Sequence, residues 1–151
     1  MTGPHLPRDH HVIRYVKFTG IEEDGSIGGL EFRLRPHRPD ETGLSVNWLE
    51  YFDDLIKAEQ VQMVRETIQL KKLGKNARFA ELNVGQVTAH LIDELDALVF
   101  VHDPKDAVAE FGPDLSHSEI RGLPPGDSDL AAAIGDMIAQ RVIATYPARS
   151  R

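Results

Sequence analysis

The feature that most constrains the fold is an alternation of apolar and polar residues near the N-terminus, interrupted by a turn signal. Residues 10–19 are rich in β-branched and aromatic side chains, and residues 26–34 carry apolar side chains at alternating positions. Such patterns are typical of strands with one buried face. The Asp-Gly pair at 24–25 is typical of a tight turn, so the sequence predicts an opening β-hairpin. Gly28 and Gly29 interrupt the second strand and indicate a bulge or a close backbone approach.

The rest of the chain shows helical and strand patterns in turn. Asn47 followed by Glu50 is typical of a helix N-cap with its capping box. A continuous apolar run at 97–102 is typical of a strand buried on both faces. Residues 103–126 are rich in Pro and Gly and are predicted to be a long loop. The other predicted elements are helices over 58–73, from Gly85 to Leu98 and from Asp127 or Ser128 to Val142, and a strand over 79–84.

This order of elements predicts an α+β fold. We expect a small, mostly antiparallel or mixed sheet, opened by the hairpin and packed against about four helices. The alternative is an α/β fold with a parallel crossover in the C-terminal half, because a strand, a helix and a strand follow one another there. Residues 1–9 are predicted to be a flexible lead-in, 10–147 one domain and 148–151 a tail.

Composition excludes several classes of protein. The 151 residues contain no cysteine, which excludes disulfides, thiol nucleophiles and zinc–thiolate sites. No apolar run approaches the length of a membrane span, and no secretory signal is visible, so we expect a cytoplasmic protein without a membrane segment. The formal charge of −7 argues against nucleic acid as a partner, because phosphate contacts require a positive face.

Cationic and aromatic residues around the expected hairpin form the first candidate site. Guanidinium groups bind phosphate or carboxylate through paired donors, and aromatic rings add stacking. Such a face would hold a nucleotide or an acidic partner. The alternative is a solvated sheet face whose arginines pair with nearby carboxylates. The candidate binding residues are Arg14, Tyr15, Arg33, Arg35, His37 and Trp48.

Histidines and carboxylates near the expected strand 97–102 form the second candidate site. His102, Asp103, His117 and Glu119 would bind a metal or relay protons if the fold brought them together. Structural roles for these histidines are the alternative. The sequence has no HxxxH or HExxH spacing, so we predict no metal site and no cofactor. The candidate catalytic residues are His102, His117 and Glu119.

Two further chemistries lack a motif. No serine stands in a G-x-S-x-G or S-x-x-K context, and no glycine-rich phosphate loop is present. A transferase that splits a nicotinamide dinucleotide requires an arginine, a serine on a strand and a glutamate around one cleft. Arg33, Ser45 and Glu119 are residues of the required types, but their spacing in the sequence imposes no constraint.

Two hypotheses about function follow. The first is a small, non-catalytic binding or regulatory module that acts through a protein partner, either another protein or a second copy of this chain. The second is an enzyme acting on a phosphorylated or nucleotide substrate. In that case Arg33 and Arg35 hold phosphate, and His102 or His117 transfers a proton.

Overall fold

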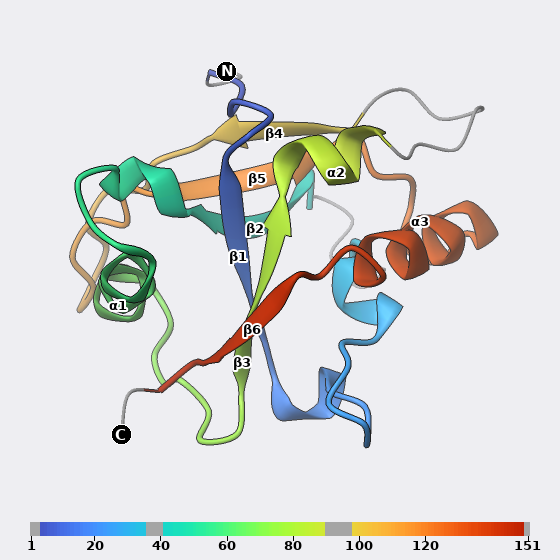
Figure 1. The fold of residues 1–151 in the computed structure, drawn as a ribbon, viewed down its shortest axis with the longest axis horizontal. Helices are drawn as coiled ribbons and strands as arrows, with labels where there is room; N and C mark the ends of the chain where they lie inside the picture. Colours follow the sequence, from blue (N-terminus) through green and yellow to red (C-terminus); the bar gives the residue numbers. More distant parts are fainter. Residues whose placement is uncertain (1–3, 36–40, 90–97, 150–151) are drawn as a thin grey trace.

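The computed structural model describes residues 4–35, 41–89 and 98–149. In these ranges six strands form one sheet in the order β4-β5-β2-β1-β3-β6, and every neighbouring pair is antiparallel (Figure 1). The strands are β1 His11–Val16, β2 Gly43–Trp48, β3 Arg78–Asn83, β4 Val99–His102, β5 His117–Arg121 and β6 Ala144–Pro147. The α-helices are α1 Lys57–Thr67, α2 Val84–Ala89 and α3 Asp129–Ala139. Short 3-10 turns are η1 Phe18–Gly20, η2 Gly29–Phe32 and η3 Leu49–Phe52.

The predicted hairpin is wrong. The neighbours of β1 are β2 and β3, and the segment expected to be the second strand contains the 3-10 turn η2. Phe32 is buried while Leu30 is 71% exposed, so the alternating residues do not share one buried face. Gly29 explains the departure, because a Cβ there would lie 2.9 Å from the Asp136 nitrogen of α3. The glycine thus permits a close backbone approach to a helix.

The class is α+β, but the expected arrangement of its elements needs correction. The described residues contain three α-helices rather than about four, and all their strand pairings are antiparallel, which overturns the parallel crossover. Asn47 lies within β2 and does not cap a helix. Strands β2, β5 and β6 were not expected, and β5 lies in the segment predicted to be a loop. Ser128 caps α3 as predicted, since its Oγ accepts a hydrogen bond from the Ala131 nitrogen.

One face of the sheet packs on the larger apolar core, which α3 and η2 cover. The other face is divided into two parts. Over β1 and β3 it packs against α1 and η3, whereas over β2 and β5 it carries polar side chains. The larger core includes Val12, Val16, Val46, Leu82, Phe100 and Ile120 of the sheet with Phe32, Ile134 and Ile138 above it. The smaller core includes Ile13, Phe79, Leu49, Val61 and Val64.

The sheet is split between its two central strands. β1 and β2 are paired only at Val12–Trp48 and Ile13–Asn47, whereas β1 and β3 share six pairs and β2 and β5 share five. Figure 1 shows β1 and β3 running across the direction of β2, β4 and β5. The two halves therefore diverge beyond Ile13 and leave an opening between β1 and β2.

The edge strand β4 is extended by the N-terminal segment. Leu6 donates a backbone hydrogen bond to Phe100, and His102 donates one to Pro4. Leu6 is buried in the larger core. Among the described residues, no helix is long and apolar enough to cross a membrane.

Candidate functional site

A cleft of about 580 Å³ opens where the sheet is split. Its walls come from β1, β2, β5, the segment around η2, the residues after α1 and the loop between β4 and β5. Five cationic and three acidic side chains line it, so its charge is opposite in sign to that of the whole chain. These side chains are Arg14, Lys17, Arg33, Arg35 and Lys105, with Glu31, Glu41 and Asp114.

Arg14 bridges the two halves of the sheet. Its Nε donates to the Glu31 carbonyl at 2.7 Å and its Nη1 to the Ser45 carbonyl at 2.8 Å. Burial lowers the pKa of Arg14 to about 10, while nearby Glu31 raises it. The guanidinium is therefore a cation at neutral pH, held in the split by main-chain acceptors, and the nearby carboxylates of Glu31 and Glu41 offset part of its charge.

The two other arginines of the cleft differ in their partners. Arg35 forms an ion pair with Glu41, and it also donates its backbone N–H to the same carboxylate. Burial raises the pKa of Glu41, but the hydrogen bonds from Arg35 more than offset this and lower it. The buried Nε of Arg33 finds no acceptor among the described residues. A buried donor without an acceptor is costly, so Arg33 is a natural contact for an anion entering the cleft.

Ser45 and Glu119 lie opposite each other on β2 and β5. Cross-strand partners have adjacent side chains on one face of the sheet, and none of the described helices belongs to a core cluster on this part of the face. Arg121 donates to Glu119 at 2.9 Å and fixes the carboxylate, while Ser45 lines the cleft. A hydroxyl and a carboxylate are therefore presented together beside three arginines.

His117 links this pair to the end of β4. Its Nδ1 donates to the Asp103 carbonyl at 2.8 Å and lies 3.5 Å from the Asp103 carboxylate. Its Nε2 lies 3.1 Å from the Ser45 Oγ. The imidazole is 3% exposed and lines the cleft. Ser45, His117 and Asp103 thus form a continuous chain of polar contacts that the serine motifs of the sequence did not indicate.

The buried Asn47 side chain binds two residues of the segment that leads into His117. The Asn47 side chain donates to Asp114 at 2.8 Å and to Ser116 at 3.0 Å. Burial raises the pKa of Asp114, while the nearby His117 and the hydrogen bond from Asn47 lower it. The sequence placed Asn47 at a helix start because its contacts with Asp114 and Ser116 are long-range.

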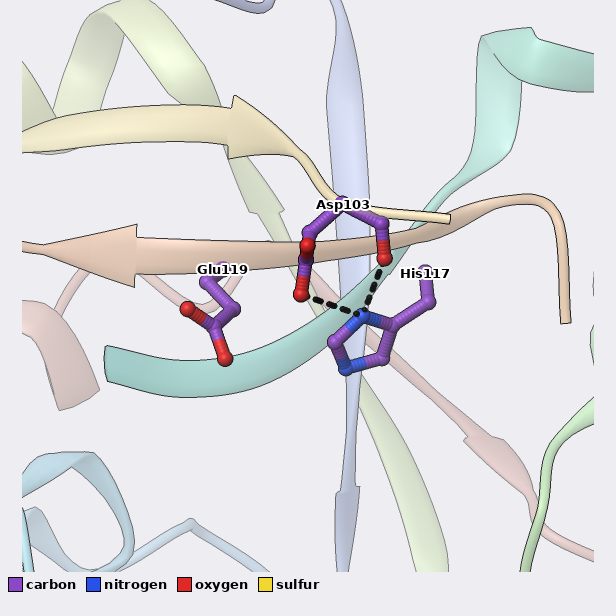
Figure 2. Close-up of side chains that lie close together, drawn as sticks. All are labelled: Asp103, His117 and Glu119. Atoms are coloured by element: carbon purple, nitrogen blue, oxygen red, sulfur yellow. Dashed lines mark hydrogen bonds and ion pairs between the residues drawn. The ribbon is translucent and has the colours of Figure 1, made fainter. Parts of the chain in front are cut away.

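Asp103, His117 and Glu119 are close enough to be considered as metal ligands. Each offers one ligand atom, and these atoms lie within 4.8 Å of one another. Figure 2 shows them beside β5, with Asp103 and His117 joined. A carbonyl only accepts, so the Nδ1 bonded to Asp103 carries hydrogen and is no ligand. The Nε2 is the remaining ligand atom, and any other partner there, cation or hydroxyl, would have to displace the Ser45 hydroxyl.

The candidate residues from the sequence are divided between two places. Arg14, Tyr15, Arg33 and Arg35 line the cleft together with His117, and Glu119 lies beside Ser45 at its wall. Trp48 and His102 lie elsewhere, with ring centroids 5.2 Å apart, and His102 donates to the Leu115 carbonyl. The candidate His37 is outside the described residues.

Sequence reasoning missed Lys105 and Asp114 as cleft residues and the contact between Ser45 and His117. One signal was available for the last of these. Glu119 and Arg121 alternate with the apolar Ile120, as in a strand with one polar face, although the alternation does not extend to His117 and Ser118, which are both polar. The surrounding Pro and Gly residues favoured the loop interpretation.

Comparisons with protein-family models, with curated proteins and with solved structures find no match to this chain.

Proposed function

We propose that this protein is an enzyme that binds a nicotinamide dinucleotide in the split of its sheet and breaks the bond between nicotinamide and ribose. The observation that carries the proposal is the pairing of Ser45 with Glu119 beside a cleft lined by arginines. The residue types that such a transferase requires thus come together on neighbouring strands. In this proposal Arg14 of β1 and Arg33 together provide the arginine contacts that the transferase requires.

The arginines supply the contacts for the diphosphate. Guanidinium groups bind phosphate oxygens through paired, charge-assisted hydrogen bonds. Arg14 is anchored by two carbonyl acceptors, and the Nε of Arg33 has no acceptor in the described part of the chain. An anion in the cleft would satisfy the buried donor of Arg33 and compensate the charge of Arg14. Glu41 already compensates Arg35, which leaves Arg35 a weaker contact.

Ser45 and Glu119 supply the contacts for the ribose. Breaking a glycosidic bond develops positive charge on the anomeric carbon, and a fixed carboxylate stabilises that charge in the transition state. Glu119 is held by Arg121 and faces the side where Ser45 lies. The Ser45 hydroxyl donates and accepts hydrogen bonds, so it suits the hydroxyl groups of a sugar.

The split itself supplies contacts for the nicotinamide ring. Main-chain groups of alternate residues point to opposite sides of a strand. His10 accepts from the Val84 nitrogen on the β3 side, and His11 donates to Glu50 on the β2 side. The N–H and C=O of Tyr15 therefore point into the split, where β2 does not pair with them. A carboxamide offers the matching acceptor and donor, and the Tyr15 ring offers a stacking surface.

The test is to incubate the protein with the oxidised nicotinamide dinucleotide and to measure released nicotinamide. Glu119→Gln should lower the rate by about 10²–10³-fold, because it removes the carboxylate from the developing charge. Glu23→Gln, at an exposed turn position, should retain the rate. If the wild-type protein binds the dinucleotide and releases no nicotinamide, the proposed reaction is wrong.

A second candidate function, association with a second copy of this chain, is favoured by an apolar groove on the molecule. The groove measures about 450 Å³ and is lined by Tyr51, Met63, Ile68, Phe111 and Leu115 among others. Apolar patches of this kind mark contact surfaces in many proteins. Sedimentation should show a dimer that Leu115→Glu dissociates, and a wild-type protein that stays monomeric at high concentration would remove this candidate.

A further inference from the structure

We infer that the glycosyl group is transferred to a hydroxyl compound, an alcohol or water, and that His117 takes the proton of that hydroxyl. This inference rests on the proposed function, which assigns the diphosphate and the ribose to other residues. His117 is one of three buried polar residues of the cleft, with Asn47 and Asp114, that those assignments leave without a role. Its contacts show which ring nitrogen carries the hydrogen and which kind of group can bind the other nitrogen.

The tautomer of His117 follows from its partners. The Asp103 carbonyl can only accept a hydrogen bond, so the Nδ1 at 2.8 Å carries the hydrogen. In the neutral ring the Nε2 then presents a lone pair. At 3.1 Å from it lies the Ser45 Oγ, which donates its hydrogen to that lone pair. The structure therefore already shows a hydroxyl donor in place at Nε2, as general base catalysis requires.

The surroundings of His117 suit the proton that it would receive. Asp103, Asp114 and Glu119 face the ring from the end of β4, from the following loop and from β5 itself. Arg14 and Lys105 line the cleft in which the ring lies. A positive charge on the imidazole is thus offset chiefly by Asp103 and Asp114, since Glu119 is already paired with Arg121. The burial of the ring keeps bulk water away from its Nδ1 contact.

The step balances without any further reagent. The bond between the anomeric carbon and the ring nitrogen breaks, and nicotinamide leaves with the electron pair. The acceptor oxygen forms the new bond to that carbon while its hydrogen passes to the His117 Nε2, which later releases it to solvent. Glu119 stabilises the cationic carbon and His117 removes the proton, so the two residues have separate roles.

The same arrangement disfavours anionic acceptors in the natural reaction. A carboxylate or phosphate acceptor has no proton to lose and needs no base. It would also approach His117 beside Asp114, which lines the cleft, and close to the carboxylates of Asp103 and Glu119. A neutral hydroxyl is not repelled by these carboxylates, and it can donate its hydrogen to the Nε2 lone pair of His117. The chemistry of the wall therefore assigns the class of acceptor.

The test uses the full chain, the oxidised nicotinamide dinucleotide, and azide as a nucleophile that attacks without losing a proton. His117→Ala should lower nicotinamide release in water by about 10²-fold or more, the usual contribution of a general base. Added azide should restore most of that loss and give a glycosyl azide. His117→Gln, which keeps a polar side chain, should behave in the same way, and dinucleotide affinity should stay within about twofold.

Two comparison variants separate the possible results. His102→Gln alters a histidine outside the cleft and should leave the rate unchanged, while Glu119→Gln should not recover with azide, because the cation remains unstabilised. Unchanged rates in both His117 variants, or a loss that azide does not repair, would overturn the role of His117. A wild-type protein that releases no nicotinamide overturns the proposed function itself, and the inference with it.

Discussion

Arg14 contributes to both the fold and the site through one guanidinium group. Its two carbonyl acceptors belong to segments that no strand pairing joins, the turn η2 and the strand β2. Buried main-chain carbonyls need donors, and here a side chain replaces the missing strand contact. Neither acceptor carries a full charge, so only the nearby carboxylates of Glu31 and Glu41 offset the charge of the guanidinium.

Arg14→Lys should therefore weaken anion binding more than it weakens the fold. A lysine keeps the charge but loses the planar set of donors that reaches both carbonyls. We expect the affinity for ADP-ribose to fall about tenfold or more, since a hydrogen bond to a charged group contributes about 1.5–3 kcal/mol. Calorimetric titration measures this. Arg65→Lys is the control, because Arg65 also donates to a carbonyl, Pro147, but does not line the cleft.

Asp114 should make stability depend on pH in a defined direction. Burial raises its pKa above the ordinary value of 3.8, so the folded state holds the proton more tightly than the unfolded state. Between those two pKa values the folded chain binds more protons, and the free energy of unfolding falls as pH rises. Each tenfold difference in acid dissociation constant corresponds to about 1.4 kcal/mol.

Asp114→Asn removes that titration while its side-chain oxygen still accepts from Asn47. Urea unfolding at several pH values, from about 4 upward, should show a smaller decline for the variant than for the wild-type protein. Equal slopes for the two proteins would show that Asp114 does not titrate with the burial-raised pKa described above.

At the scale of elements, local pattern predicted those segments whose side chains pack on the core. β1 and β4 lie within the predicted strands, β3 overlaps its predicted strand with a shift of one residue, and α3 begins at its predicted cap. The elements that failed are governed by distant partners. Segment 26–34 forms η2 because Gly29 lets the backbone meet α3, and that contact is invisible in local alternation.

The candidate site was predictable in its residue types and not in its geometry. β5 was missed because His117 and Glu119 face the cleft and give a central strand a polar face. Asn47 was misplaced because its partners Asp114 and Ser116 are more than sixty residues away. The sequence named only Arg33 as the arginine of a nicotinamide dinucleotide transferase. The proposal adds Arg14, because only the structure shows that its guanidinium lies in the split between β1 and β2.

The contact between η2 and α3 should be sensitive to a single methyl group. A Cβ at Gly135 would lie 2.5 Å from the Gly29 carbonyl, so Gly135→Ala forces the two backbones apart. The higher helix propensity of alanine stabilises α3 by up to about 1 kcal/mol. Overpacking costs about 1–3 kcal/mol, and we expect net destabilisation.

Thermal unfolding of Gly135→Ala measures the cost of that contact. Gly112→Ala is the matched control, because a Cβ there has no neighbour within 4 Å and Gly112 lies in a loop. A melting temperature for Gly135→Ala equal to that of the control would contradict the tight approach of η2 to α3.

At the scale of the whole molecule, the sheet consists of two three-stranded halves joined by two residue pairs. Each half has its own ladder, and the larger core extends under both. The polar side chains of the candidate site lie where the halves separate, on the part of the face that no described helix covers. An acidic chain thereby places its cationic cleft inside the sheet, where main-chain groups of β1 and β2 lack strand partners in the described residues, and such a cleft attracts anions.

This division predicts a pattern of amide hydrogen exchange. The Tyr15 and Ser45 N–H groups point into the split, whereas those of Arg14 and Val46 point toward β3 and β5, as the strand alternation requires. Amides outside a ladder exchange faster. We therefore expect the Tyr15 and Ser45 amides to exchange faster than the Arg14 and Val46 amides in the free protein.

Nicotinamide should slow the exchange of the Tyr15 amide, because its carboxamide oxygen accepts from that N–H while its NH₂ donates to the Tyr15 carbonyl. Nicotinic acid is the matched control, since its carboxylate lacks the donor and brings a second acceptor against the carbonyl. NMR-detected exchange with each compound compares them directly. Protection by nicotinamide alone would support ring recognition by the split, whereas equal protection by both would point to the arginines as the only determinants of binding.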